Sequence, residues 1–311
     1  GDGMFTDCTG LTGNIPVLPK SLSSAGPRIG TTARASREGM FGGCSGLTGN
    51  IPQLPERLRE AHGMFKDCTG LTGSIPQLPT ALRYAKSMFD GCRNLTGNVP
   101  ELPAGLTDGD MMFSGCHKLT GNIPQLPTGL INAYSMFEGC SGLTGNIPAL
   151  PASLEDVARM FFNCRGLTGN IPKIPASLTD TWGLFHGCSN LTGTIPELPA
   201  GLTVGQSMFA DCSKLTGTIP KLPAGLTDGS GMFKGCSGLT GNIPELPRSL
   251  VAVNVMFEGC RGLAGVTTVN GQYPYQYLIN AKTHGWMVDS ASEAVRQHFP
   301  TDWGGSCTSC E

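Results

Sequence analysis

The feature that most constrains the fold is a period of 24 residues. Cysteine recurs every 24 residues from Cys44 to Cys260 without a slip, and Cys8 begins the series after one longer interval of 36 residues. A representative unit, residues 232–250, reads MFKGCSGLTGNIPELPRSL. An internal period of this length is typical of solenoids, in which each unit buries its apolar side against its neighbours. The sequence therefore predicts a repeat solenoid of about eleven 24-residue units.

Composition agrees with a single solenoid domain, which we expect over residues 1–265. Most of the 45 glycines and 23 prolines recur in phase, and a hydrophobic content of 39% is enough for a core. A net charge of −2 argues against a nucleic-acid partner. No apolar run reaches the roughly 18 residues that a membrane span needs, so no membrane span is expected. Because Gly1 lies inside a repeat, we expect either an upstream cap or self-association through the N-terminal edge.

Positions within the unit predict which residues form the core. Leu of Leu-Thr-Gly, the residue before the first proline, the residue between the prolines, the following Leu and Met-Phe recur in every unit. Gly after Leu-Thr suits a bend with positive φ or a close backbone approach. Proline cannot donate to a sheet ladder, so the Ile-Pro-x-Leu-Pro limb is expected to be extended rather than a central strand. The strand is predicted instead in residues 59–63 and their equivalents.

That predicted strand contains the least repetitive position of the unit. Its third residue is small or aliphatic in most units and is expected to point inward, as Ala61 and Ala85 would. Its fourth residue is of nine different types at nine equivalent places. Aromatic side chains are enriched at binding sites, and several lie here. The candidate ligand-binding stripe consists of His62, Tyr84, Lys86, Asp110, Tyr134, Trp182 and Gln206.

Drift of exposed residues is the alternative explanation of this variation. The residue after each core Phe varies as well, for example Lys66, Asp90, Phe162 and His186. Variation alone therefore does not establish a binding face.

Two segments depart from the repeat. The long first interval places an insertion of 12 residues within residues 23–38, and insertions in solenoids map to loops on one face. Residues 266–311 are expected to form a C-terminal capping segment with two helices. The first would start at Pro274 and carry Tyr275, Leu278, Ile279 and Lys282 on one side. The second would begin with a capping box of Ser290 and Glu293, carry Ala291, Ala294, Val295, His298 and Phe299, and end at Pro300.

The cysteine ladder predicts packing rather than chemistry. Zinc sites need convergent ligands, whereas this ladder offers a single row, so the thiols are expected in the core and no metal or cofactor is expected. Cys307 and Cys310 lie outside the ladder, and no βαβ pattern surrounds them. A tail disulfide is favoured there over a redox or metal site. No His-x-x-x-His pair and no recurring triad is present, so we expect no catalytic residues and no enzyme.

The repeat resembles a known class of leucine-rich repeats. Met-Phe-x-Gly-Cys-Ser-x-Leu-Thr and Phe-x-x-Cys-x-x-Leu, which cover residues 3–265, are similar to the Met-Phe-x-x-Cys variety of the bacterial BspA-like class. Leu-Thr-Gly-x-Ile-Pro resembles the convex limb of plant-type repeats. The resemblance implies a curved right-handed leucine-rich-repeat coil with a parallel β ladder, secretion to a bacterial cell surface, and binding rather than catalysis.

Two functional hypotheses remain open. The first is an extracellular or cell-surface recognition and adhesion protein that binds a protein or a glycan through the varied strand face. The second is a structural spacer or a self-assembling fibre subunit.

Overall fold

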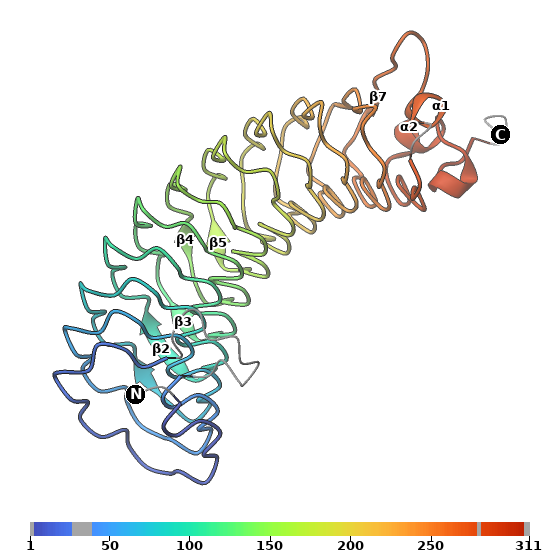
Figure 1. Ribbon diagram of the computed structural model, residues 1–311. Helices are drawn as coiled ribbons and strands as arrows, with labels where there is room; N and C mark the ends of the chain where they lie inside the picture. The colour runs from blue at the N-terminus through green and yellow to red at the C-terminus, as the bar shows by residue number, and fades with distance from the viewer. Residues whose placement is uncertain (1–2, 27–38, 279–280, 308–311) are drawn as a thin grey trace. The chain divides into compact units, whose positions relative to one another are not determined.

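The computed structural model describes residues 3–26, 39–278 and 281–307. The chain forms two compact units, which are larger than the 24-residue repeat. The first unit consists of Gly1–Asp156 and Asn163–Gly166, and the second consists of Val157–Phe162 and Leu167–Glu311. From here on, one 24-residue repeat is called a coil. In each unit the chain makes one coil per 24 residues, and successive coils stack on one another (Figure 1). The predicted repeat solenoid is therefore confirmed.

Backbone hydrogen bonds join each coil to the next on three sides. On the Leu-Thr-Gly side, the Thr72 N–H donates to the Gly49 carbonyl at 2.8 Å. After the second proline, the Arg83 N–H donates to the Arg59 carbonyl at 2.9 Å. On the Met-Phe side, the Phe65 N–H donates to the Met88 carbonyl at 2.9 Å, and the equivalent bond recurs along the coils. Backbone groups that would be costly to bury unpaired are thus satisfied by the neighbouring coil.

Short parallel strands occupy the Leu-Thr-Gly-Asn side. In the first unit, β1 (Gly73–Ser74), β2 (Leu95–Asn98) and β3 (Leu119–Thr120) form one sheet in that order, and β4 covers Gly145–Asn146. Figure 1 shows β2 and β3 on successive coils. In the second unit, β5 covers Leu167–Thr168, and β6 (Asn242–Ile243) pairs in parallel with β7 (Gly265–Val266).

The predicted location of the strand was wrong. Residues 59–63 and their equivalents contain only one bridging residue per coil, such as Glu60, which pairs with Tyr84. The reason is local, because the Met64 N–H turns back to the Ala61 carbonyl at 3.1 Å and Gly63 has a φ of 56°. A chain that curls directly after the bridge cannot extend the ladder.

The glycine of Leu-Thr-Gly is needed for two reasons. Gly73 has a φ of 76°, which glycine adopts without steric cost. A Cβ at Gly73 would also collide with the side-chain oxygen of Asn50 in the preceding coil. The expected bend with a positive φ is confirmed.

The core is built from ladders of identical or similar residues. The predicted Leu, Ile, Met and Phe positions are buried in most coils of both units, but in the first repeat Met4 is exposed and Phe5 is half-buried. Phenylalanine rings stack with centroids 5.4 to 5.8 Å apart from Phe5 to Phe137, and 5.6 to 5.9 Å apart from Phe161 to Phe257. Such offset pairs add about 0.5 to 1.5 kcal/mol each beyond the area that they bury.

The ladder thiols are buried donors, with one exception. Each cysteine from Cys44 to Cys260 directs its Sγ to the carbonyl of a core phenylalanine in the preceding coil, at 2.9 to 3.1 Å. Burial raises the pKa of the Cys140 and Cys260 thiols to about 12. Cys8 is exposed, so the expectation of a buried thiol is wrong for the first cysteine of the series.

The C-terminal segment has less helix than predicted. Helix α1 covers Pro274–Tyr277, α2 covers Glu293–Arg296, and a 3₁₀ helix covers Thr301–Trp303. The first helix starts at Pro274 as expected but does not extend to Leu278, and Ile279 lies outside the described residues. None of the described helices is long and apolar enough to cross a membrane.

The predicted capping box of the second helix was also wrong. Ser292 is the N-cap of α2, and the Ser290 hydroxyl instead bonds Asp289. The Ser292 hydroxyl bonds the Leu263 carbonyl, so tertiary contact with the last repeat decides where this helix begins.

One part of this segment repeats the solenoid. Thr283 forms a parallel bridge with Ala252, and the N–H of Phe257 donates to the Met287 carbonyl at 2.8 Å. These bonds match those between regular coils. Residues 283–289 therefore add one further rung, which covers the backbone of the last repeat.

The buried ladder leads to a prediction about thiol reactivity. In the native protein, Ellman's reagent should modify Cys8 rapidly and the thiols from Cys44 to Cys260 slowly. A pKa near 12 leaves about a thousandth of the thiolate that a pKa near 9 gives at the same pH, and burial adds a steric barrier. The Cys8→Ser variant should lose the rapid phase, in a background where Cys307 and Cys310 are also serine. Rapid modification of several ladder thiols would contradict the assignment.

Candidate functional site

The varied positions form a continuous column in the first unit. The residue directly after one varied residue donates its backbone N–H to the carbonyl of the varied residue in the next coil. Gly63 bonds Lys86 in this way at 2.8 Å, and Ser87 bonds Asp110 at 2.7 Å. The column of the first unit consists of His62, Lys86, Asp110 and Tyr134.

The same pattern holds in the second unit. The Arg159 N–H donates to the Trp182 carbonyl, and the Gly183 N–H donates to the Gln206 carbonyl, both at 2.8 Å. Trp182 and Gln206 therefore lie on successive coils. We call the fourth positions of both units, residues 62, 86, 110, 134, 158, 182, 206, 230 and 254, the varied column.

Tyr84 lies beside this column rather than in it. It occupies the bridging position two residues before Lys86, where it pairs with Glu60 and Asp108. Its ring stacks against the ring of His62 with centroids 6.1 Å apart. The two aromatic side chains are therefore neighbours, although they come from different positions of the repeat.

Burial separates the column from the core. The third-position residues, such as Ala61 and Val157, are fully buried, as expected. Most members of the varied column are half-buried. Trp182 is 36% exposed, whereas Asp110 is only 9% exposed. The predicted stripe is thus partly accessible, and Asp110 is its least accessible member.

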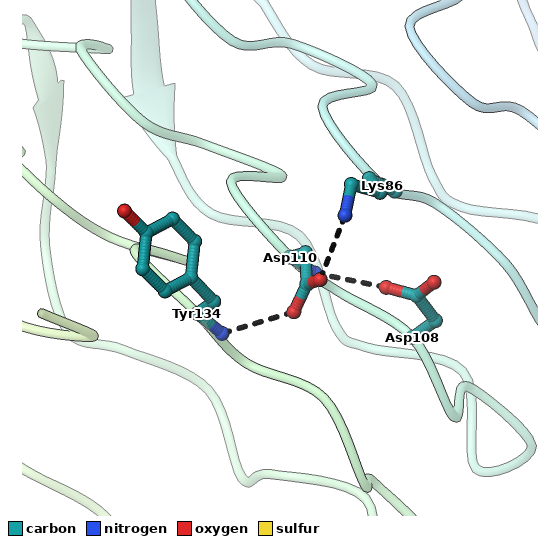
Figure 2. Close-up of polar contacts among 4 residues, drawn as sticks. All are labelled: Lys86, Asp108, Asp110 and Tyr134. Carbon is teal, nitrogen blue, oxygen red and sulfur yellow. Dashed lines mark hydrogen bonds and ion pairs between the residues drawn. The ribbon is translucent and has the colours of Figure 1, made fainter. Parts of the chain in front are cut away.

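Asp110 is held by a network that explains its burial (Figure 2). Its Oδ1 accepts a hydrogen bond from the Tyr134 N–H at 3.0 Å, and its Oδ2 forms an ion pair with Lys86 Nζ, also at 3.0 Å. The Asp110 N–H donates to Asp108 Oδ1 at 3.1 Å. Both carboxylate oxygens are engaged by the protein itself. Asp110 is therefore placed to hold three coils in register rather than to face a ligand.

Burial also shapes the electrostatics around this network. It raises the pKa of Asp108, although the hydrogen bond from the Asp110 N–H opposes the increase. It lowers the pKa of His62, although Asp108 and Glu60 oppose the decrease. Burial therefore favours the neutral form of the His62 ring.

A second acidic group lies in the row after the core phenylalanines. Burial, and next the charge of Asp67, raise the pKa of Asp90 to about 6. Lys66 and a hydrogen bond with Ser114 oppose this increase. Because the folded structure raises the pKa of Asp90, ionisation of this carboxyl group opposes folding.

The second unit contains an aromatic and cationic cluster. Arg159 Cζ lies 4.2 Å from the centroid of the Phe162 ring and 5.5 Å from that of Trp182. The His186 ring stacks on Phe162 with centroids 4.4 Å apart, and its Nε2 lies 3.6 Å from Asp211 Oδ2. We call Arg159, Phe162, Trp182 and His186 the Arg159 cluster.

Sequence reasoning identified only Trp182 of this cluster. Phe162 and His186 were treated as drift in the row after the core phenylalanines. One signal could have separated them, because Phe162 is the only aromatic residue besides His186 in that row, and the two are 24 residues apart. Equivalent positions of adjacent coils lie side by side, so this spacing predicts contact.

The backbone of Arg159 follows the pattern of the repeat. Its φ is 57°, in the left-handed region, and Met111, Ser207 and Val255 at equivalent positions have φ of 53°, 52° and 48°. Glycine takes this position in other coils, as Gly183 and Gly231 do. The left-handed residue after the varied column is therefore a feature of the scaffold, and the Arg159 cluster is distinguished by its side chains.

Three other features give little support for a functional site. In the described ranges, 3–26, 39–278 and 281–307, no group of three His, Cys, Asp or Glu side chains is arranged to hold a metal ion. Cys310 lies outside the described residues, so its disulfide with Cys307 stays a prediction. An open hollow on the proline side of the first unit is lined by Asn122, Asn146 and their neighbours, none of them charged.

The Asp110 network leads to a stability prediction. Asp110→Ala should lower the free energy of unfolding by about 2 kcal/mol, because it leaves the Lys86 ammonium and the Tyr134 N–H without their acceptor. Gln206→Ala, at the equivalent position of another coil, should change it by less than about 0.5 kcal/mol. Thermal denaturation of both variants checks this. An equal effect of the two substitutions would show that Asp110 has no special structural role.

Asp90 leads to a prediction about pH. The folded-state pKa of about 6 lies above the ordinary aspartate pKa of 3.8, so folding becomes less favourable as pH rises between these values and the carboxyl group ionises. Asp90→Asn should therefore stabilise the protein by about 1 kcal/mol at pH 7.5, after allowance for solvent screening, and by almost nothing at pH 4. Glu101→Gln, at an exposed position, is the matched control. A stabilisation that is the same at both pH values would contradict the assignment.

Comparison with known proteins finds similar repeat structures. A comparison with curated proteins finds no match. A leucine rich cell surface protein from Faecalibacterium prausnitzii A2-165 is similar, with 20% identity, a TM-score of 0.48, and coverage of 91% of this chain and 86% of that one. A leucine-rich repeat protein from Bacteroides ovatus ATCC 8483 has 21% identity, a TM-score of 0.40, and the same two coverages.

The family match is more specific. The profile of the family described as Mycoplasma protein of unknown function, DUF285, matches residues 86–198 and 156–269. The two matches together span more than half of the chain. The predicted membership in the BspA-like class of leucine-rich repeats is confirmed with it. The chain belongs to the DUF285 family.

Proposed function

We propose that this chain is a surface-exposed or secreted repeat protein that recognises a protein or glycan ligand through the varied column. One observation carries the proposal. In each of the two units, one face presents unlike and partly accessible side chains, one per coil, on a backbone that is otherwise repeated from coil to coil. Concave or extended faces of solenoids are the surfaces that such proteins use for binding.

The position of the insertion supports the same face. Ala25 is fully buried at the third position, and its carbonyl accepts a hydrogen bond from the Met40 N–H at 2.8 Å. In a regular coil only two residues separate these positions, as His62 and Gly63 do between Ala61 and Met64. The inserted residues therefore enter the chain at the varied column. Insertions of this kind often map to the binding face.

The surface location rests on the family resemblance. BspA-like repeats imply export to a bacterial surface, and ligand recognition there would take the form of adhesion. The buried thiols are compatible with this location, because a core cysteine behaves as a small hydrophobic side chain in any redox compartment.

The varied column leads to a binding prediction. Purified protein is tested by surface plasmon resonance against immobilised extracellular-matrix proteins and mucin. Binding to at least one of them is expected, and the double variant Tyr134→Ala/Trp182→Ala should weaken it by at least about 2 kcal/mol, or about 30-fold. Aromatic side chains dominate such interfaces, which is the physical reason for the size of the effect.

The matched control lies on the Leu-Thr-Gly side. Thr96→Ala/Thr240→Ala replaces two exposed side chains, one in each unit, and should leave the affinity unchanged. If both double variants bind as the parent does, the varied column is not the binding face. If the parent binds none of the surfaces, the spacer or fibre hypothesis is favoured instead.

A further inference from the structure

We propose that Trp182 is the platform of a saccharide subsite that binds a neutral pyranose ring of a glycan. This inference rests on the proposed function, since it names the ligand class of one part of the varied column. It also assigns Arg159, Phe162 and His186 as positioning residues behind the platform.

The backbone of Trp182 is fixed on both sides. Its N–H donates to Asp180 Oδ1 at 2.9 Å, and its carbonyl accepts the Arg159 N–H at 2.8 Å. A tryptophan side chain has only two rotatable bonds. The ring therefore loses little conformational freedom when a ligand binds, which is the property expected of a preorganised anchor.

The Arg159 cluster supports the ring from one side. The guanidinium of Arg159 lies over two aromatic rings, with Cζ 5.5 Å from the ring centroid of Trp182 and 4.2 Å from that of Phe162. His186 stacks on Phe162, and its Nε2 lies 3.6 Å from Asp211 Oδ2. Two consecutive coils thus contribute the four side chains of the Arg159 cluster, and Trp182 is the most exposed of the four.

The backbone of Arg159 has the left-handed conformation that recurs at this position of the repeat, with φ of 52° at Ser207 and 48° at Val255 in the same unit. What distinguishes Arg159 is its side chain, which places a guanidinium over two aromatic rings. Cation–π attraction of this kind stabilises the arrangement of the Phe162 and Trp182 rings.

The surroundings favour a sugar over a protein surface. In the described part of the second unit, Trp182 and Trp286 are the exposed large hydrophobic side chains. The core of a protein interface needs a broader apolar patch than a single ring. A pyranose ring presents one face of C–H groups, which packs on the electron-rich face of an indole, and a rim of hydroxyl groups that need polar partners.

Positively charged, negatively charged and neutral polar side chains occur around Trp182 in the chain and on the neighbouring coils. Gln206 follows Trp182 in the column, Asp180 precedes it in the chain, and Asp211 lies beyond His186. Arginine and carboxylate side chains are interspersed, so neither a polyanion nor a polycation is favoured. A ring with neutral hydroxyl groups matches this mixture.

Intrinsic tryptophan fluorescence tests the proposal on the full chain. The probes are hexasaccharides of β-1,4-linked glucose, β-1,4-linked N-acetylglucosamine and β-1,4-linked mannose. At least one of them should produce a saturable change in emission, because the stacked sugar displaces water from the Trp182 ring. Trp182→Ala should weaken binding by at least about 30-fold, measured by isothermal titration calorimetry.

Two further variants separate a platform from a general structural effect. Trp286→Ala removes a tryptophan that is 65% exposed in the C-terminal segment, and should leave the affinity unchanged. Arg159→Gly should weaken binding several-fold while the thermal midpoint stays the same or rises, because glycine accepts the left-handed conformation. A purely structural role of Arg159 would instead lower the midpoint.

The outcomes distinguish this inference from the proposed function. If no hexasaccharide gives a saturable response, or if Trp182→Ala binds as the parent does, the saccharide subsite is ruled out. If an extracellular protein still binds and Trp182→Ala weakens that binding, the site is a protein hot spot and the varied column stands as the binding face. If sugars bind and Trp286→Ala abolishes the response, the platform has been assigned to the wrong tryptophan.

Discussion

Hydrogen bonding between successive coils is the constraint on which the rest of the structure depends. A coil of 24 residues can satisfy its backbone only if the next coil follows the same path, so each position that shapes this path must repeat. The glycine of Leu-Thr-Gly repeats because the bend there needs a positive φ in each coil, as the 76° at Gly73 and the 72° at Gly241 show. The core phenylalanines repeat because a smaller side chain in the stack would leave a cavity between the neighbouring rings. Freedom to vary is left only where a side chain points away from both the core and the neighbouring backbone.

The sequence predicts most of the fold for this reason, and it fails where the repeat ends or where pairing depends on local geometry. The period alone identifies the solenoid and its core ladders. The period does not show which segment of the coil forms the strands. Strand pairing depends on the left-handed residue after the varied column, such as Gly63, because the chain turns there and the ladder ends. The period also fails in the C-terminal segment, where contact between Ser292 and Leu263 decides how α2 begins. Helix signals in a short cap are weak beside such tertiary contacts.

The candidate site shows the same division between repeated and unique residues. The varied column could be found from nine unlike residues at equivalent places, and within each unit the structure brings these positions together on consecutive coils. What the sequence could not show is which members are accessible. Asp110 is unlike its neighbours because it holds three coils together, whereas Trp182 is unlike them and remains exposed. Variation at one position of a repeat can therefore serve the scaffold itself, as at Asp110, and burial identifies the members that do so.

A recurring backbone device lets single residues in this column change without loss of the fold. Asp108, Asp180 and Asp228 each accept a hydrogen bond from the N–H two residues later, at 2.9 to 3.1 Å. Such a bond fixes the backbone of the varied residue whatever its side chain is. Aspartate, tryptophan and serine occupy the three positions that are fixed in this way, although they share no property of size or charge. The scaffold thus supplies the geometry and the varied residue supplies the chemistry, so a binding surface on such a chain can be altered one coil at a time.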